Sequence, residues 1–398
     1  MISMGSLTRR VPADWHGSLL TCGTEVNVRT DEPFGFHDYA RSVCEPGVNV
    51  MLTRPSRSSW QISRCPLGRI VLQSGAAGGA TIADGVSQSG SFVFFLRNSG
   101  HSHPMSLNGE AVTVNDIAVF PPGKPFAVMC RGPHKWISIS VPLEVLEEAG
   151  FSRAQLHALG AAASLIRVLH PLARQLVAAA TYAMELIQST PISADASRYR
   201  NIERALLADL FTAITHSDAS AHASTRQINR SLDRIVRQAL AFLRTQDGQD
   251  HHVEYLCRAI DVAERSLLRA FHKFFGIGPT QYLKLRRLNN VHAALRASGC
   301  KETTVTGVLT GCGVTELGRF AGAYKALFGE CPSETLKQQS EAKRHAVPLV
   351  DKPVRGIQEG PLAGMEAMRY PAGAAPKISA SRWSRSPFHS WRSLSLSS

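Results

Sequence analysis

One pattern occurs twice in the second half of this chain, and it limits the available folds more than any other sequence feature. The two copies lie within residues 250–335 and are offset by 53 positions. The first copy ends Phe271-x-x-x-Phe275-Gly276-x-x-Pro279-Thr280, and the second ends Tyr324-x-x-x-Phe328-Gly329-x-x-Pro332-Ser333. A solenoid needs at least about three repeats to bury a continuous core. The pattern therefore predicts one small helical unit present in duplicate.

Each copy has the residue order of a helix, a turn and a second helix. Glycine accepts the left-handed conformation that ends many helices, so we expect Gly276 and Gly329 to end the second helix of each copy. The four expected helices run over 253–260, 263–275, 304–311 and 315–328. The apolar side chains expected to face the core are Leu267, Leu268, Phe271 and Phe275 in the first copy and Leu317, Phe320, Tyr324 and Leu327 in the second.

A single helix is predicted between the two copies, over 279–298. Residues 280–297 contain no proline or glycine, and apolar side chains recur there at the three- and four-residue steps of one helix face. These apolar side chains are Tyr282, Leu285, Leu288, Val291 and Leu295. The helix would hold the two units at a fixed separation. Arg286 and Arg287 on it could reach DNA phosphates, although a solvated helix face is the alternative.

Positive charge is concentrated in the C-terminal part of the chain. The formal net charge is +13, of which residues 226–340 supply +7, residues 341–398 supply +5 and residues 1–225 supply +1. An excess of lysine and arginine in one region is typical of proteins that bind phosphate backbones. Charge alone does not exclude a solvated basic surface that binds nothing. The functional interpretation therefore depends on the repeat.

Four stretches of the repeat region match a known family in order and spacing. They are Glu264-Arg-Ser-Leu-Leu-Arg-Ala-Phe-His-Lys-Phe-Phe-Gly276, Pro279-Thr-Gln-Tyr-Leu-Lys-Leu-Arg-Arg-Leu288, Gly313-Val-Thr-Glu-Leu-Gly-Arg-Phe320 and Tyr324-Lys-Ala-Leu-Phe-Gly-Glu-Cys-Pro-Ser333. Over roughly 100 residues this region resembles the DNA-binding domain of the AraC/XylS family of bacterial transcription regulators. The resemblance implies two helix-turn-helix units whose recognition helices enter successive major grooves of double-stranded DNA. It also implies control by a small-molecule effector bound in the N-terminal domain.

The resemblance and the residue chemistry together predict the DNA contacts. Arginine can donate two hydrogen bonds to guanine, and glutamate can accept one from cytosine. The predicted contact residues are Glu264, Arg265, Ser266, Arg269, Lys273, Arg286, Arg287, Thr315, Glu316, Arg319 and Lys325. Three positions depart from the family. Ala263 stands where a capping serine is usual, which costs about 1 kcal/mol of helix stability, and Leu309 and Val314 stand where alanine and phenylalanine are usual.

The first half of the chain is expected to be β structure. Short apolar runs are separated by turn residues, and Asn108-Gly109 between two such runs is a strong hairpin signal. This pattern predicts a small antiparallel barrel. Residues 115–123, ending Pro-Pro-Gly, resemble a cupin strand and turn, and such a barrel can enclose one small ligand. The residues that could line it, or equally fill its core, are Trp60, Phe92, Phe94, His101 and Trp136.

Helices are expected to follow the β region. Pro142 suits the first turn of a helix, and Pro171 predicts two helices or a kink within 161–188. The stripe of Ile202, Leu206, Leu210 and Ile214 predicts another helix, which could be core or could pack on a second copy of the chain. The expected divisions are an N-terminal segment 1–30, a cupin-like sensor 31–216, a linker 217–225, the DNA-binding domain 226–340 and a basic disordered tail 341–398.

The main alternative is a metal-dependent cupin enzyme fused to a DNA-binding domain. His101-Ser-His103 resembles the His-x-His of metal-binding cupins, but Glu110 lies too far along the chain and Phe126 stands where a later histidine would follow. No nucleophile set and no phosphate-binding glycine loop is recognisable, and none of the eight cysteines forms a C-x-x-C pair. We therefore expect no enzyme activity, no metal and no cofactor.

The sequence as a whole predicts an α+β multidomain protein. We expect an N-terminal antiparallel β-barrel of cupin-like type with added helices, and a C-terminal all-α domain with two helix-turn-helix units joined by a linker helix. No apolar run is long enough to cross a bilayer and no signal peptide is evident, so we expect a cytoplasmic protein that does not bind membranes. The expected partners are double-stranded DNA and a small-molecule effector, with RNA polymerase and a second copy of the chain as further candidates.

Overall fold

The computed structural model describes most of the chain between residues 35 and 345. The described ranges are 35–43, 48–56, 59–87, 90–98, 103–189, 196–217, 226–245, 252–298 and 304–345. The segment 1–30 and most of the linker 217–225 and of the tail 341–398 lie outside these ranges. No helix in the described ranges is long and apolar enough to cross a membrane.

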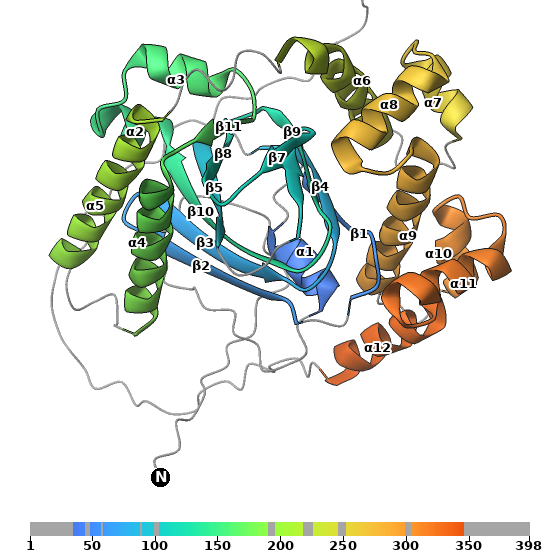
Figure 1. Ribbon diagram of the computed structural model, residues 1–398. Helices are drawn as coiled ribbons and strands as arrows, with labels where there is room; N and C mark the ends of the chain where they lie inside the picture. Colours follow the sequence, from blue (N-terminus) through green and yellow to red (C-terminus); the bar gives the residue numbers. More distant parts are fainter. Residues whose placement is uncertain are drawn as a thin grey trace, which may run out of the picture. The chain divides into compact units, whose positions relative to one another are not determined.

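Eleven described strands form two antiparallel sheets, which we call together the β-domain (Figure 1). The five-stranded sheet has the order β1 (Val48–Leu52), β4 (Thr81–Val86), β9 (Pro125–Cys130), β6 (Met105–Leu107), β7 (Glu110–Val112). The six-stranded sheet has the order β11 (Ser164–Arg167), β8 (Asp116–Phe120), β5 (Ser91–Asn98), β10 (His134–Pro142), β3 (Ile70–Ala77), β2 (Gln61–Leu67). The antiparallel prediction is confirmed, but the predicted barrel is not closed, because none of the described strands pairs across the two sheets.

The hairpin predicted at Asn108-Gly109 joins β6 to β7. Both residues have positive φ, 50° at Asn108 and 79° at Gly109, which matches the twist of the flanking strands. The Asn108 side chain also fixes the neighbouring strand, since the backbone N–H of Ala127 donates to its Oδ1 at 2.9 Å.

Helices α2 (Leu143–Glu148), α3 (Arg153–Gly160), α4 (His170–Ser189) and α5 (Ala196–Thr215) follow the strands, and α1 (Phe36–Val43) precedes them. Helices α4 and α5 pack on the six-stranded sheet through one apolar cluster (Figure 1). The kink predicted at Pro171 is wrong. Residues just before it form β11, and Pro171 lies in the first turn of α4, where its missing N–H costs no hydrogen bond.

Phe92 and Phe94 belong to the cluster under α4 and α5. Successive side chains of a strand point to opposite faces, so both phenylalanines lie on the outer face of the sheet. Of the two alternatives given for these residues, lining a ligand cavity or filling a core, the structure favours the second: they fill the core between sheet and helices.

The C-terminal region is helical, as predicted. It comprises α6 (Arg226–Thr245), α7 (Val253–Ala259), α8 (Glu264–Phe275), α9 (Pro279–Ala297), α10 (Val305–Gly311), α11 (Leu317–Phe328) and α12 (Pro332–His345). All five residues of the apolar stripe predicted on α9 are buried. One apolar cluster joins α6 and α8 to Met51, Ile82 and Met129 of the five-stranded sheet. The outer face of that sheet is thus covered by the C-terminal helices.

Candidate DNA-binding surface

Helices α7 and α8 form a first helical pair, and α10 and α11 form a second. In the first pair, α8 begins after Ala263, which makes no side-chain cap, and ends at Gly276 with φ of 67°. Phe271 and Phe274 are buried on one side of α8. Residues spaced by four positions lie on one face of a helix, so Arg265 and Arg269 project together from the opposite side.

The DNA-contact residues predicted on α8 lie at the protein surface. Glu264, Arg265, Arg269 and Lys273 are exposed, and Ser266 is half-buried. Glu264 lies in the first turn, where a negative charge is favourable, and Lys273 lies in the last turn, where a positive charge is favourable. The contacts themselves stay predictions.

In the second pair, α11 also ends at a left-handed glycine, Gly329 with φ of 80°. Thr315, Glu316, Arg319 and Lys325 are exposed. Arg319 forms an ion pair with Glu316 at 2.9 Å, with side chains 85% and 67% exposed. Such an exposed pair adds little stability, but it leaves α11 with less uncompensated positive charge than α8.

Two residues of the predicted core are exposed instead. Leu268 on α8 is 42% exposed and Leu317 on α11 is 37% exposed. Each lies at the edge of the apolar side of its helix, where a periodicity of 3.6 residues does not separate flank from core.

The turns of the two pairs differ by one residue. In the first pair Asp261 has φ of 53° and the N–H of Val262 donates to the carbonyl of Cys257. In the second pair Gly313 has φ of 74° and the N–H of Val314 donates to the carbonyl of Leu309. Thr315 is the additional residue before α11. The second helices of the pairs, α8 and α11, therefore begin 53 positions apart, whereas the first helices, α7 and α10, begin 52 positions apart.

Helix α9 connects the pairs, and it does not present both predicted arginines to solvent. Arg286 is 8% exposed, and its Nη2 donates to the carbonyl oxygen of Leu243 on α6 at 3.1 Å. Its predicted phosphate contact is therefore not available in this conformation. Arg287 is half-buried, and burial lowers the pKa of its guanidinium.

A buried polar cluster holds α9 against the five-stranded sheet. The hydroxyl of Tyr282 donates to Oδ2 of Asp84 on β4 at 2.9 Å, and Nδ2 of Asn49 on β1 donates to the same oxygen at 3.3 Å. Asp84 is fully buried. Burial raises the pKa of its carboxyl, and the nearby positive charges of Arg286 and Arg244 oppose that rise.

The side chain of Asn289 makes a second contact between α9 and the sheet. Its Oδ1 accepts from the N–H of Leu52 at 2.9 Å, and its Nδ2 donates to the carbonyl of Leu52 at 3.0 Å. The amide thus pairs with the backbone of β1 as a neighbouring strand would. Sequence reasoning missed Asp84 and Asn289, although each is a polar residue within an apolar pattern, and that was the available signal.

Trp60 and Trp136, also predicted to bind an effector, are occupied by protein contacts. Nε1 of Trp136 donates to the hydroxyl of Tyr39 on α1 at 2.8 Å, and the rings of Trp60 and Tyr39 lie 4.9 Å apart. His101 lies outside the described residues. Within the described ranges no group of three or more histidine, cysteine, aspartate or glutamate side chains could hold a metal ion; the His-x-His alternative is untested.

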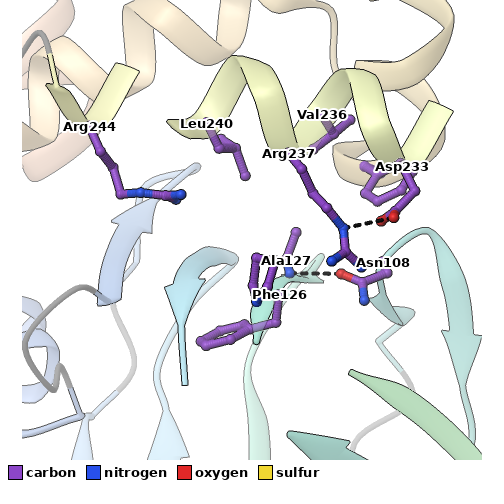
Figure 2. A pocket seen from close by; sticks show the side chains of 10 residues that line it. Asn108, Phe126, Ala127, Asp233, Val236, Arg237, Leu240 and Arg244 are labelled. Atoms are coloured by element: carbon purple, nitrogen blue, oxygen red, sulfur yellow. Dashed lines mark hydrogen bonds and ion pairs between the residues drawn. The ribbon is translucent and has the colours of Figure 1, made fainter. Parts of the chain in front are cut away.

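A small pocket lies between α6 and the strands (Figure 2). Asn108, Phe126 and Ala127 approach it from the strands, and Arg237, paired with Asp233 at 2.7 Å, approaches it from α6. Its volume of about 10 Å³ holds about one water molecule. This pocket is therefore too small for an organic ligand.

Known proteins resemble mainly the region of the two helical pairs. A family model described as a helix-turn-helix domain matches residues 256–338. The XylDLEGF operon transcriptional activator of Pseudomonas putida is 32% identical over 110 residues, which are 28% of this chain and 33% of that protein. The probable thc operon regulatory protein of Rhodococcus erythropolis is 28% identical over 172 residues, 43% of this chain and 48% of that protein. The chain thus matches a third to a half of the length of these relatives.

A solved structure also resembles the chain. The crystal structure of the AraC-like transcriptional activator CuxR matches with a TM-score of 0.33 and 17% identity, over 62% of this chain and 88% of that chain. A TM-score this low does not establish a shared fold, so the family assignment depends on the sequence matches.

Proposed function

Residues 256–338 are a helix-turn-helix domain of the AraC/XylS type, and from this premise we propose that the chain is a sequence-specific DNA-binding transcription activator. Both helical pairs act as helix-turn-helix units, with α8 and α11 as recognition helices. The observation that carries the proposal is the pair of equal-length helices, each ending at a left-handed glycine, whose polar sides are exposed. Activation rather than repression is proposed because the relative from Pseudomonas putida is a transcriptional activator.

Gel-shift titration of the full chain against a randomised duplex library, at several salt concentrations, tests the proposal. We expect binding that weakens steeply as salt rises, because neutralised phosphates release counterions. We expect sequences enriched from the library to share a site. A folded chain with no salt-dependent binding to any duplex contradicts the proposal.

We propose further that the N-terminal region controls DNA binding through α9. The support is the buried contact of Tyr282 with Asp84 and of Asn289 with the backbone of Leu52, since α9 also joins the two helical pairs. A change in the position of β1 or β4 would therefore move the element that sets the separation of the recognition helices.

The effector would bind in a groove beside α4. This groove has a volume of about 570 Å³, within the range common for ligand sites. Arg97 and Arg174 line it together with the exposed apolar surfaces of Val114 and Tyr182. Arg97 is held at the groove by hydrogen bonds to the carbonyls of Val112 and His103. The exposed guanidinium of Arg174 beside apolar surface suits a small organic anion, and Glu185 would disfavour a second negative charge.

Thermal unfolding of the full chain with a panel of aliphatic and aromatic monocarboxylates tests this site. We expect at least one of them to raise the Tm, because a ligand that binds only the folded state stabilises it. Arg174→Ala should abolish the rise, and Arg153→Ala, an exposed arginine on α3, should leave it intact. A rise that persists in Arg174→Ala, or no rise with any carboxylate, contradicts the proposal.

A further inference from the structure

The two proposed recognition helices can be aligned position by position. Helices α8 and α11 are each 12 residues long, begin 53 positions apart and end at equivalent left-handed glycines. The buried rings of Phe271 and Tyr324 occupy equivalent positions, so the two helices present the same side to the core. Any residue exposed opposite these rings on α8 therefore has a direct counterpart on α11.

The counterparts of the two exposed arginines of α8 are glycines. Arg265 corresponds to Gly318 and Arg269 to Gly322, and all four positions are exposed. These positions lie one turn apart on the side opposite the core of each helix. The outward side of α8 thus carries two long cationic side chains, and α11 carries no side chain at the two equivalent positions.

Neither glycine is required by the fold. Gly318 and Gly322 have no positive φ, and a Cβ atom added at either one meets nothing within 4 Å. A larger residue would therefore fit at both positions. The absence of side chains at these two positions therefore affects the surface: α11 can come close to DNA there, but Gly318 and Gly322 offer no side-chain donors to base edges.

We infer that the two units divide the work of recognition: α8 reads bases through Arg265 and Arg269, and α11 holds its groove without reading bases at the two central positions. The inference rests on the proposed function. Sequence is read by hydrogen bonds to base edges, whereas phosphate contacts supply affinity that does not depend on sequence. On α11, Lys325 and the paired Arg319 flank the glycines and supply the second kind of contact.

Selection of the full chain on a duplex library with both half-sites randomised tests the inference. We expect strong base preference in one half-site and weak preference in the other. Arg265→Ala and Arg269→Ala should each reduce discrimination in the strong half-site by roughly 5- to 150-fold, the loss expected for one two-donor contact to guanine. Equal base preference in both half-sites, or arginine variants that keep the full preference, overturns the inference.

The glycine positions give the reciprocal experiment. Gly322→Arg should create a new base preference in the weak half-site, because it restores the side chain present on α8. The matched control Gly322→Ala should change binding to all sequences by one common factor. A Gly322→Arg protein that binds DNA with an unchanged preference contradicts the inference. If the unaltered chain binds no duplex specifically, the proposed function itself is contradicted. The two failures are therefore distinguishable.

Discussion

The two sheets of the β-domain are covered in different ways. The six-stranded sheet packs on α4 and α5 through fully buried apolar side chains such as Ile70, Leu176 and Leu210. The five-stranded sheet packs on the C-terminal helices through apolar side chains as well, but Asp84 and Asn289 are buried within that contact. The contact of the six-stranded sheet includes one buried carboxylate, since Glu203 on α5 accepts from the N–H of Arg69 at 3.4 Å. The contact of the five-stranded sheet includes both a buried carboxylate and a buried amide, whose hydrogen bonds have to be satisfied.

The two contacts therefore differ in what has to be exchanged with water when the helices leave the sheet. Burial of apolar surface is lost entirely when helices leave a sheet. A buried hydrogen bond can be exchanged for one to water, and its net contribution is only about 0.5–1.5 kcal/mol. One carboxylate oxygen of Asp84, Oδ1, has no hydrogen-bond partner in the part of the chain that the structure describes, which weakens the second contact further. We therefore expect the C-terminal helices to separate from the β-domain more readily than α4 and α5 do.

The largest effect should follow from a cavity under α4. Leu176→Ala should lower the free energy of unfolding by about 2–5 kcal/mol, because Leu176 is fully buried between sheet and helices. Urea unfolding followed by circular dichroism measures it. The matched control is Leu169→Ala, the same chemical change at a side chain that is 62% exposed, where we expect less than about 0.5 kcal/mol. Equal losses in both variants would show that α4 is not part of the core.

A smaller and more local effect should follow from Asn289→Ala. This change leaves the N–H and carbonyl of Leu52 without their partner on α9, at a cost of about 1–3 kcal/mol. We expect faster hydrogen exchange at the Leu52 amide with little change in exchange across the six-stranded sheet. Asn290→Ala, at the half-buried neighbouring position, is the control. Protection of Leu52 that survives Asn289→Ala would mean that the amide contact does not hold the two regions together.

The sequence predicted those parts of the molecule whose residues repeat or alternate. The duplicated pattern, the apolar stripe of α9 and the Asn108-Gly109 hairpin are local signals, and each is confirmed. The closed barrel is wrong because closure depends on pairing between strands far apart in sequence, which alternation does not specify. The prediction that Leu268 faces the core is wrong, because the width of a helix's apolar face depends on the elements that pack against it.

The partners in the polar contact on the five-stranded sheet could not be predicted from sequence, for a different reason. Arg286 was expected at the surface because charged side chains are rarely buried unless they are paired. Its partner, the carbonyl of Leu243, belongs to α6, and nothing in the order of residues places α6 beside α9. Asp84 and Asn289 likewise acquire their roles only when β1, β4 and α9 meet. The predicted contacts on α8 and α11 stay predictions, although the structure leaves nearly all of them exposed.

The smallest expected effect tests the charge of Asp84 through pH. Burial raises the pKa of this carboxyl in the folded protein, so the folded state binds its proton more tightly than the unfolded state. Stability contributed by that proton is present below the unfolded pKa and is lost as pH rises through the folded pKa. Relative to Asp84→Asn, which keeps an acceptor for the hydroxyl of Tyr282, the unaltered chain should therefore lose stability as pH rises above the ordinary pKa of an aspartate, about 4.

Urea unfolding of both proteins at a series of pH values measures this difference, and Asp261→Asn, at an exposed position where asparagine tolerates the positive φ, controls for the loss of one negative charge. Parallel stability curves for the unaltered chain and Asp84→Asn would mean that Arg286 and Arg244 fully offset the burial of the carboxylate. The charge of Asp84 would then not weaken the contact between the five-stranded sheet and the C-terminal helices. The two contacts would differ only in the number of their buried hydrogen bonds.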